Sequence, residues 1–155
     1  MSAKKVYTIK EGKTKAMKFC AYQERTQQQV RDKLYDWGLY GDEVEEVIGY
    51  LITENFLNEE RFAKTYASGH FRMKKWGRIK IKQGLEQKKL STYCIKKGLE
   101  EIDSVEYQET LNELLSKKYQ SIRDSNLYIR KQKAVKYLLQ KGYEADLVWA
   151  ATEEL

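Results

Sequence analysis

The chain of 155 residues contains no proline, two cysteines and one histidine. Because proline is the residue that most strongly interrupts a helix, only glycine and capping residues are left to end helices here. Cys20, Cys94 and His70 are too few and too far apart for a Cys/His zinc site or a disulfide framework. We therefore expect reduced, buried thiols, no metal and no cofactor.

Long apolar runs are also missing. No window approaches the eighteen or more apolar residues of a membrane span, and the first residues lack the apolar segment of a secretory signal. The sequence therefore predicts a cytoplasmic protein, expected to be a monomer, that makes no contact with a membrane.

Motifs for catalysis and nucleotide binding are absent as well. The single histidine, His70, lies in a basic segment and has no acidic neighbour in sequence that would orient it as a general base. The nine glycines form neither a phosphate-binding GxxxxGK[ST] pattern nor GxGxxG. The carboxylates fall at predicted helix starts and on solvated faces, where capping and the helix dipole explain them. We predict no catalytic residues and a protein that is not an enzyme.

Helical patterns are present along most of the chain. Thr26 and Gln29 have the spacing of a capping box, and Asn58 followed by two glutamates is a strong helix start. Leu51 and Phe62 are predicted core residues. A short leading helix is expected near residues 15–24, and the sequence as a whole predicts an all-α fold. The further helices are predicted over 26–38, 42–54, 58–74, 76–88, 91–101, 104–121, 125–141 and 144–155.

The apolar pattern repeats along the chain. Leu34, Leu85 and Leu138 can be aligned at offsets of 51 and 53 residues, and the apolar positions that follow them coincide. Units of three short helices enclose little core alone, so we expect tandem three-helix repeats stacked into an elongated curved array. Chance alignment of leucines is the alternative. The predicted units are a basic disordered tail (1–14, with a lone strand at 6–9 as an alternative), the leading helix with the first repeat (15–74), a second repeat (75–122) and a third truncated to two helices (123–155).

Charge alternates with this repeat, and the net charge is +6. Residues 70–89 carry eight basic residues against a single acidic one, Glu86, with Phe71 and Trp76 interleaved. Such a segment is either a docking surface for a polyanion or acidic partner, or a solvated helix face. Charge alone does not decide between these. The candidate binding residues are Arg72, Lys74, Lys75, Arg78, Lys80, Lys82, Lys88 and Lys89.

Two motifs resemble the RecX family of regulatory proteins. The first runs from Leu57 to Ala63 and is followed by Tyr66, and the second is the Trp-Gly-Arg-Ile sequence at 76–79. They occur in the order and at the separation that the family shows, and the resemblance extends from about residue 16 to the C-terminus. The chain departs from the family at three places: at Thr26, where serine is usual, at Asn58 and Glu59, where two aspartates are usual, and at Lys89, where glycine is usual. The matching motif positions are Arg25, Leu57, Asn58, Glu59, Arg61, Phe62, Ala63, Tyr66, Trp76, Gly77, Arg78 and Ile79.

The resemblance implies tandem three-helix units and a non-enzymatic modulator of the RecA recombinase. Such proteins lie along the groove of the RecA filament and damp its extension, ATP hydrolysis, strand exchange and the SOS response. The implied partners are the RecA filament and, as a second partner, single-stranded DNA. The resemblance does not assign the contact residues. Two alternatives stay open: a helical nucleic-acid-binding module that acts through its basic residues without RecA, and a structural adaptor.

Overall fold

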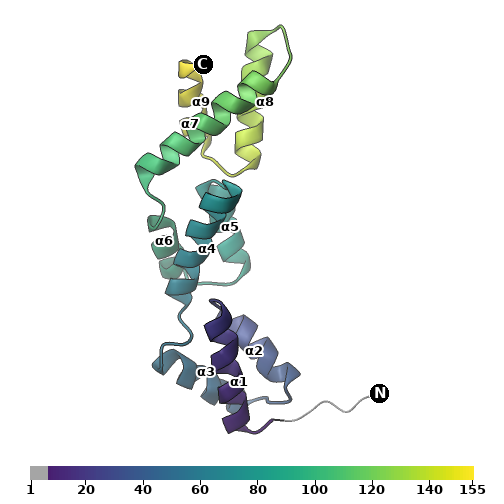
Figure 1. Cartoon of the computed structure of the whole chain (residues 1–155), viewed down its shortest axis with the longest axis vertical. Coiled ribbons are helices and arrows are strands. Elements are labelled where there is room, and N and C mark those ends of the chain that lie inside the picture. Colours follow the sequence, from purple (N-terminus) through teal and green to yellow (C-terminus); the bar gives the residue numbers. More distant parts are fainter. Residues whose placement is uncertain (1–6) are drawn as a thin grey trace, which may run out of the picture. The chain divides into compact units, whose positions relative to one another are not determined.

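The computed structural model describes residues 7–155 (Figure 1). Within these residues the chain forms nine α-helices and a terminal 3-10 turn, η1 (Thr152–Glu154), and contains no strand. The all-α prediction is confirmed, and the helices lie close to their predicted bounds. They are α1 (Ile9–Tyr22), α2 (Gln27–Asp36), α3 (Asp42–Thr53), α4 (Glu59–Lys74), α5 (Arg78–Gln87), α6 (Thr92–Glu100), α7 (Ser104–Ser121), α8 (Leu127–Gln140) and α9 (Ala145–Ala151).

The leading helix α1 begins earlier than predicted. The Thr8 hydroxyl accepts a hydrogen bond from the Glu11 amide, and the Glu11 carboxylate accepts one from the Thr8 amide, which is a capping box. The predicted disordered tail is therefore corrected: residues 9–14 are helical, and the strand alternative is not seen at residues 7–9. The buried stripe of α1 consists of small residues, so its apolar pattern was weak: Gly12, Ala16 and Cys20. Residues 1–6 of the predicted tail lie outside the described part of the chain.

The described residues divide into two compact units, one that ends at Phe62 and one that runs from Ala63 to Leu155. In the first unit α1, α2 and α3 pack on one another around a core of aliphatic side chains. Leu51 is fully buried in this core, and Phe62 is also buried, with 7% of its surface exposed. The other fully buried members of this core are Ala16, Val30, Leu34, Leu39, Val44 and Val47.

In the second unit α4 packs closely against α5 and α6. A Cβ added to Gly98 on α6 would lie 2.7 Å from the Ala63 carbonyl oxygen, so glycine lets α6 approach the α4 backbone. Gly84 on α5 leaves room for the ring of Tyr66, whose hydroxyl would lie 2.1 Å from an added Cβ. The last three helices pack on one another in the same unit: α7 on α8, α8 on α9 and α7 on α9.

The helices group differently from the predicted repeats. The helices pack in three groups of three: α1–α3, α4–α6 and α7–α9. The predicted repeats instead begin at α2 and leave α1 as an extra helix. The C-terminal group therefore has three helices and is not truncated. The reason for the difference is physical: a periodic apolar pattern has the same period whichever helix is counted first, so the period alone does not fix the start of a unit.

Three helices end on a left-handed residue that is not glycine. Asn55, Lys75 and Lys89 follow α3, α4 and α5 with φ of 62°, 58° and 60°. Asparagine tolerates this conformation, but a lysine there costs free energy because its Cβ approaches the backbone.

Lys89→Gly is expected to raise the free energy of unfolding by about 0.5 to 1 kcal/mol, because relief of the left-handed strain exceeds the extra backbone entropy of glycine. Urea unfolding followed by circular dichroism measures the change. The matched control is Lys82→Gly, an exposed right-handed position inside α5, which is expected to lose about 1 kcal/mol. Equal losses at both positions would contradict the prediction.

Candidate partner-binding surface on α4 and α5

The first family motif builds the start of α4. The Asn58 side chain accepts a hydrogen bond of 2.9 Å from the Arg61 amide and so caps the helix. The Glu59 carboxylate accepts a bond of 3.0 Å from the amide of Gln27, in the first turn of α2. Leu57, Phe62 and Ala63 are buried. These motif positions therefore have structural explanations.

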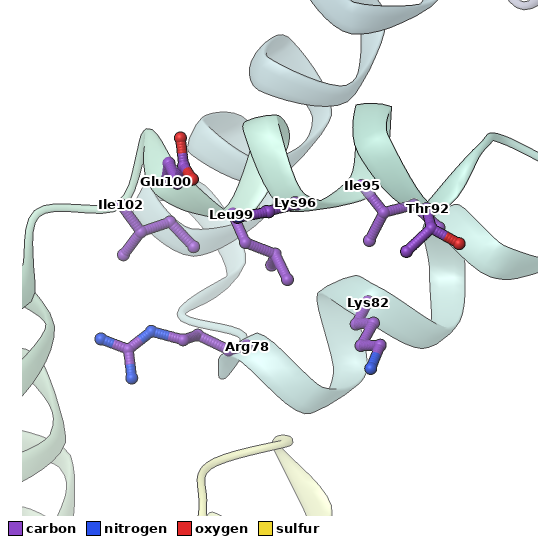
Figure 2. A pocket seen from close by; sticks show the side chains of 8 residues that line it. All are labelled: Arg78, Lys82, Thr92, Ile95, Lys96, Leu99, Glu100 and Ile102. Carbon is purple, nitrogen blue, oxygen red and sulfur yellow. The ribbon is translucent and has the colours of Figure 1, made fainter.

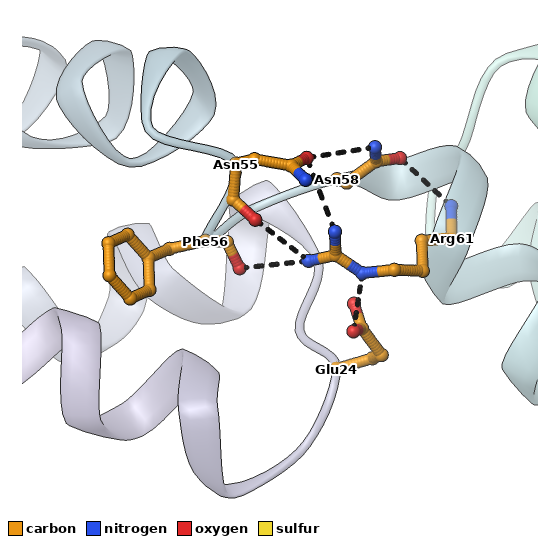
Figure 3. Close-up of polar contacts among 5 residues, drawn as sticks. All are labelled: Glu24, Asn55, Phe56, Asn58 and Arg61. Carbon is orange, nitrogen blue, oxygen red and sulfur yellow. Dashed lines mark hydrogen bonds and ion pairs between the residues drawn. The ribbon is translucent and has the colours of Figure 1, made fainter.

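Arg61 is the centre of a polar network (Figure 3). Its Nε donates to Glu24 at 2.6 Å, and Nη1 donates to the Asn55 side chain at 3.2 Å. Nη2 donates to the backbone carbonyls of Asn55 and Phe56 at 3.1 and 3.3 Å. The guanidinium thereby ties the link between α1 and α2 to the link between α3 and α4.

Arg25, the remaining motif residue of the first unit, is also occupied within the fold. Its guanidinium carbon lies 3.7 Å from the centre of the Phe19 ring, and its Nε donates to the Phe19 carbonyl at 3.0 Å. Burial raises the pKa of the neighbouring Cys20 thiol, which keeps this cysteine protonated and poorly reactive.

The second motif forms the turn between α4 and α5, and it packs on the turn between α8 and α9. The Gly77 amide donates to the Lys141 carbonyl at 2.7 Å, and the Ile79 amide donates to the Gly142 carbonyl at 2.9 Å. The Tyr143 hydroxyl donates to the Lys75 carbonyl at 2.9 Å. We call this set of bonds between the two turns the turn junction.

Arg78 also belongs to the turn junction. Its Nη1 donates to Glu144 at 2.7 Å, and its guanidinium lies 3.8 Å from the centre of the Tyr107 ring. Tyr107 is buried and its hydroxyl donates to Glu144, so burial first, and then this hydrogen bond, raise the pKa of the tyrosine above its ordinary value. The charge of Arg78 is therefore offset by a partner within the chain, which gives this candidate binding residue a structural role.

Three aromatic rings lie in contact beside this turn. The centres of Tyr66 and His70 are 3.9 Å apart with near-parallel rings, and His70 and Trp76 are 4.6 Å apart. His70 Nδ1 lies 2.8 Å from the Tyr66 carbonyl, which only accepts, so Nδ1 carries a proton. All three side chains are half-buried. We call Tyr66, His70 and Trp76 the aromatic stack.

Three of the eight candidate cations gather at the aromatic stack. The ammonium groups of Lys80 and Lys74 lie 4.6 and 5.2 Å from the centre of the Trp76 ring, and that of Lys88 lies 6.0 Å from the Tyr66 ring. These distances are in the range of cation–π contacts. Sequence reasoning missed Lys141, whose ammonium donates to the Lys74 carbonyl at 3.1 Å from a position 67 residues away.

The other candidate cations lie elsewhere. Arg72 is 3.9 Å from Glu106, an exposed ion pair of small energetic value. Lys75 and Lys89 occupy the left-handed positions after α4 and α5. The structure therefore divides the basic segment into a cluster at the stack, Arg78 in the turn junction, Lys82 beside a groove, and three separate positions, Arg72, Lys75 and Lys89.

A groove runs between α5 and α6 (Figure 2). It has a volume of about 480 Å³, and its apolar lining comes from Ile95, Leu99 and Ile102. A second hollow of about 450 Å³ shares Lys82 and Ile95 with it. The polar lining residues of the groove are Arg78, Lys82, Thr92, Lys96 and Glu100. Such a groove can receive an apolar side chain of a partner with acidic groups beside it.

The part of the chain that the structure describes has no cluster of metal-ligating side chains. Among residues 7–155, no group of three or more histidine, cysteine, aspartate or glutamate side chains is placed to hold an ion. Over the same residues, no helix combines the length and the apolar character needed to cross a membrane.

Family models match all three helix groups. The first, second and third three-helix domains of RecX match residues 13–51, 58–99 and 105–152. These segments correspond to α1–α3, α4–α6 and α7–α9, in agreement with the packing. Together they cover most of the chain.

Curated relatives carry the same name. The chain is 34% identical to regulatory protein RecX of Clostridium perfringens strain 13 over 124 residues, which are 79% of this chain and 58% of the relative. It is 35% identical to regulatory protein RecX of Clostridium tetani over 130 residues, which are 83% of this chain and 59% of the relative. The chain therefore spans about three fifths of the length of these relatives.

A solved structure shows the same fold. The crystal structure of RecX from Lactobacillus salivarius superposes with a TM-score of 0.87 at 24% identity, over 95% of this chain and 96% of that one. Together with the three domain matches, this likeness extends over nearly the whole described chain. The chain belongs to the RecX family of regulatory proteins.

Proposed function

We propose that this chain regulates the RecA recombinase by binding the RecA–DNA filament and inhibiting its extension, ATP hydrolysis and strand exchange. The observation that carries the proposal is the cluster of lysines at the aromatic stack. Among the described residues, Lys74 and Lys80 form no ion pair with a carboxylate, and both lie over the ring of Trp76. Their charges are therefore available to an anionic partner.

The groove between α5 and α6 supports a protein contact in addition to a contact with phosphates. Its Ile95, Leu99 and Ile102 offer apolar surface, and Lys82 and Lys96 add positive charge at the same place. A filament of protein on DNA presents both acidic side chains and phosphates. The second unit thus offers both chemistries that such a partner requires.

The direct test is ATP hydrolysis by RecA on single-stranded DNA in the presence of the chain. Inhibition well below one molecule per RecA monomer is expected, since a regulator that acts on the filament affects many subunits at once. Inhibition only at amounts that saturate the DNA would contradict the proposal and favour a nucleic-acid-binding module that competes for the strand.

The triple variant Lys74→Glu, Lys80→Glu, Lys82→Glu is expected to lose most of this inhibition while remaining folded. Lys74 and Lys82 are exposed, so each of these two changes moves stability by no more than about 0.5 kcal/mol. Lys80 is half-buried, so circular dichroism checks that the triple variant is folded. Arg78 is left unchanged because its bond to Glu144 belongs to the turn junction.

The matched control reverses Lys10, Lys18 and Lys136, three exposed lysines outside the cluster. Each substitution changes the charge by two, so both triple variants take the formal net charge from +6 to zero. If both variants lose inhibition equally, net charge explains the effect and the surface does not. If the first variant inhibits like the parent at matched salt, Lys74, Lys80 and Lys82 form only a solvated face.

A further inference from the structure

We infer that the aromatic stack is a binding site for single-stranded DNA, in which a nucleobase stacks on Trp76 and the surrounding lysines contact the adjoining phosphates. The inference rests on the proposed function, since the filament contains single-stranded DNA, and it names the ligand of one part of the surface. A single strand is the partner that fits, because its bases expose their faces whereas those of a duplex are stacked on one another.

Trp76, the ring at one end of the aromatic stack, is available to a ligand. Trp76 is half-buried and contacts His70 at 41° between ring planes, so the two rings are tilted rather than fully overlapped. The ammonium groups of Lys80 and Lys74 also lie near this ring, at 4.6 and 5.2 Å from its centre. An ammonium over a solvated ring is held more weakly than a stacked base, so a base can take its place.

The displaced lysines have a new partner in the strand itself. Within the strand, each base is carried by a sugar that has a phosphate on either side, and lysine stems are long and flexible enough to move from a ring to a nearby phosphate oxygen. Lys74 and Lys80 come from opposite sides of the turn that contains Trp76, and Lys88 lies at the far end of the stack beside Tyr66. Two positive charges therefore lie at the Trp76 ring, and a third lies at the other end of the stack.

The site is built before the ligand arrives. The Trp76 amide donates to the His70 carbonyl at 3.2 Å, and the next residue, Gly77, is bonded to Lys141 in the turn junction. The Tyr66 ring lies against Gly84 on α5. Because the backbone that carries Trp76 is held in place and its ring contacts His70, little conformational freedom is lost on binding, which favours stacking as a source of affinity.

The first test of this inference uses the unmutated chain. Fluorescence anisotropy compares a labelled thymidine oligonucleotide with an abasic oligonucleotide of the same length and charge. Stacking predicts about tenfold tighter binding of the base-bearing strand. Equal affinity for the two strands would overturn the inference, because the lysines would then account for all binding.

A variant tests whether the preference for the base-bearing strand comes from Trp76. Trp76→Leu is expected to lower affinity for the thymidine strand about tenfold and to leave affinity for the abasic strand unchanged within about twofold, whereas Trp76→Phe keeps most of the preference. The matched control is Trp149→Leu, a tryptophan on α9 that is 42% exposed. A preference that survives in Trp76→Leu, shown to be folded by circular dichroism, would overturn the assignment to this ring.

Inhibition of RecA measured on the same samples separates this inference from the proposed function. Inhibition of RecA by a chain that binds both strands equally would overturn the inference alone. Base-dependent binding that disappears in Trp76→Leu, without inhibition of RecA, would support the inference and overturn the proposed function.

Discussion

Gly77→Ala is expected to lower the free energy of unfolding by about 3 kcal/mol, the upper part of the range for overpacked sites. An added Cβ would lie 2.3 Å from the carbonyl carbon and oxygen of Gly142 and 2.4 Å from the Tyr143 amide. These are backbone atoms, which cannot rotate away as a flexible side chain can. The φ of Gly77 is −78°, which alanine adopts freely, so the loss comes from the close approach of the two turns. Urea unfolding measures it.

The matched controls are Gly49→Ala on α3 and Gly69→Ala on α4. Both glycines lie inside helices, and an added Cβ at either position would meet nothing within 4 Å. Each control is expected to gain up to about 1 kcal/mol from the higher helix propensity of alanine. A Gly77→Ala protein as stable as the parent would show that the turns separate easily and that the turn junction adds little to stability.

Arg61→Ala is expected to cost about 2 to 3 kcal/mol, measured in the same way. The substitution removes four hydrogen bonds made by one guanidinium and leaves Glu24, whose side chain is 23% exposed, without its cation. The arginine side chain is itself 37% exposed, so we expect a smaller loss of unfolding free energy than for a fully buried ion pair. Arg61→Lys is expected to recover only part of the loss, because an ammonium cannot bond to all three partners in a plane.

Arg31→Ala is the control for Arg61. Arg31 also bonds to a carboxylate through two nitrogens, at 3.0 and 3.3 Å from Glu45, but that glutamate is 61% exposed. The expected cost is about 0.5 kcal/mol, in the range of surface ion pairs. Equal costs at the two arginines would mean that the contacts of Arg61 with the backbone of the α3–α4 link are of little energetic value.

Most helices of this fold could be predicted because each carries its own local signals. Thr26 and Asn58 cap the helices that follow them, and apolar residues at helical spacing mark the buried face between caps. The start of α1 escaped prediction because Gly12 and Ala16 bury a face with almost no hydrophobic contrast. The grouping of the helices was not predicted, because it depends on contacts between helices and the period of the apolar pattern contains no information on these contacts.

For the candidate surface, the sequence predicted which residue types are present but not which residues they contact. Sequence placed Arg78 among the binding cations because it lies between lysines, whereas its partner Glu144 is 66 residues away. The aromatic stack was partly readable, since Tyr66 and His70 are spaced as neighbours on one helix face. Trp76 follows Lys75, which adopts a left-handed conformation that the sequence gives no reason to expect of a lysine.

The turn junction also has a consequence for the order of folding. Its side-chain bonds join residues separated by 66 to 68 positions, so a long loop must close before any of them forms. Closing that loop costs entropy that grows with the logarithm of its length, whereas each three-helix group assembles largely from residues nearer in sequence. We therefore expect the groups to form first and the junction to close after the rate-limiting step. Substitutions at the junction would then accelerate unfolding and leave the refolding rate almost unchanged.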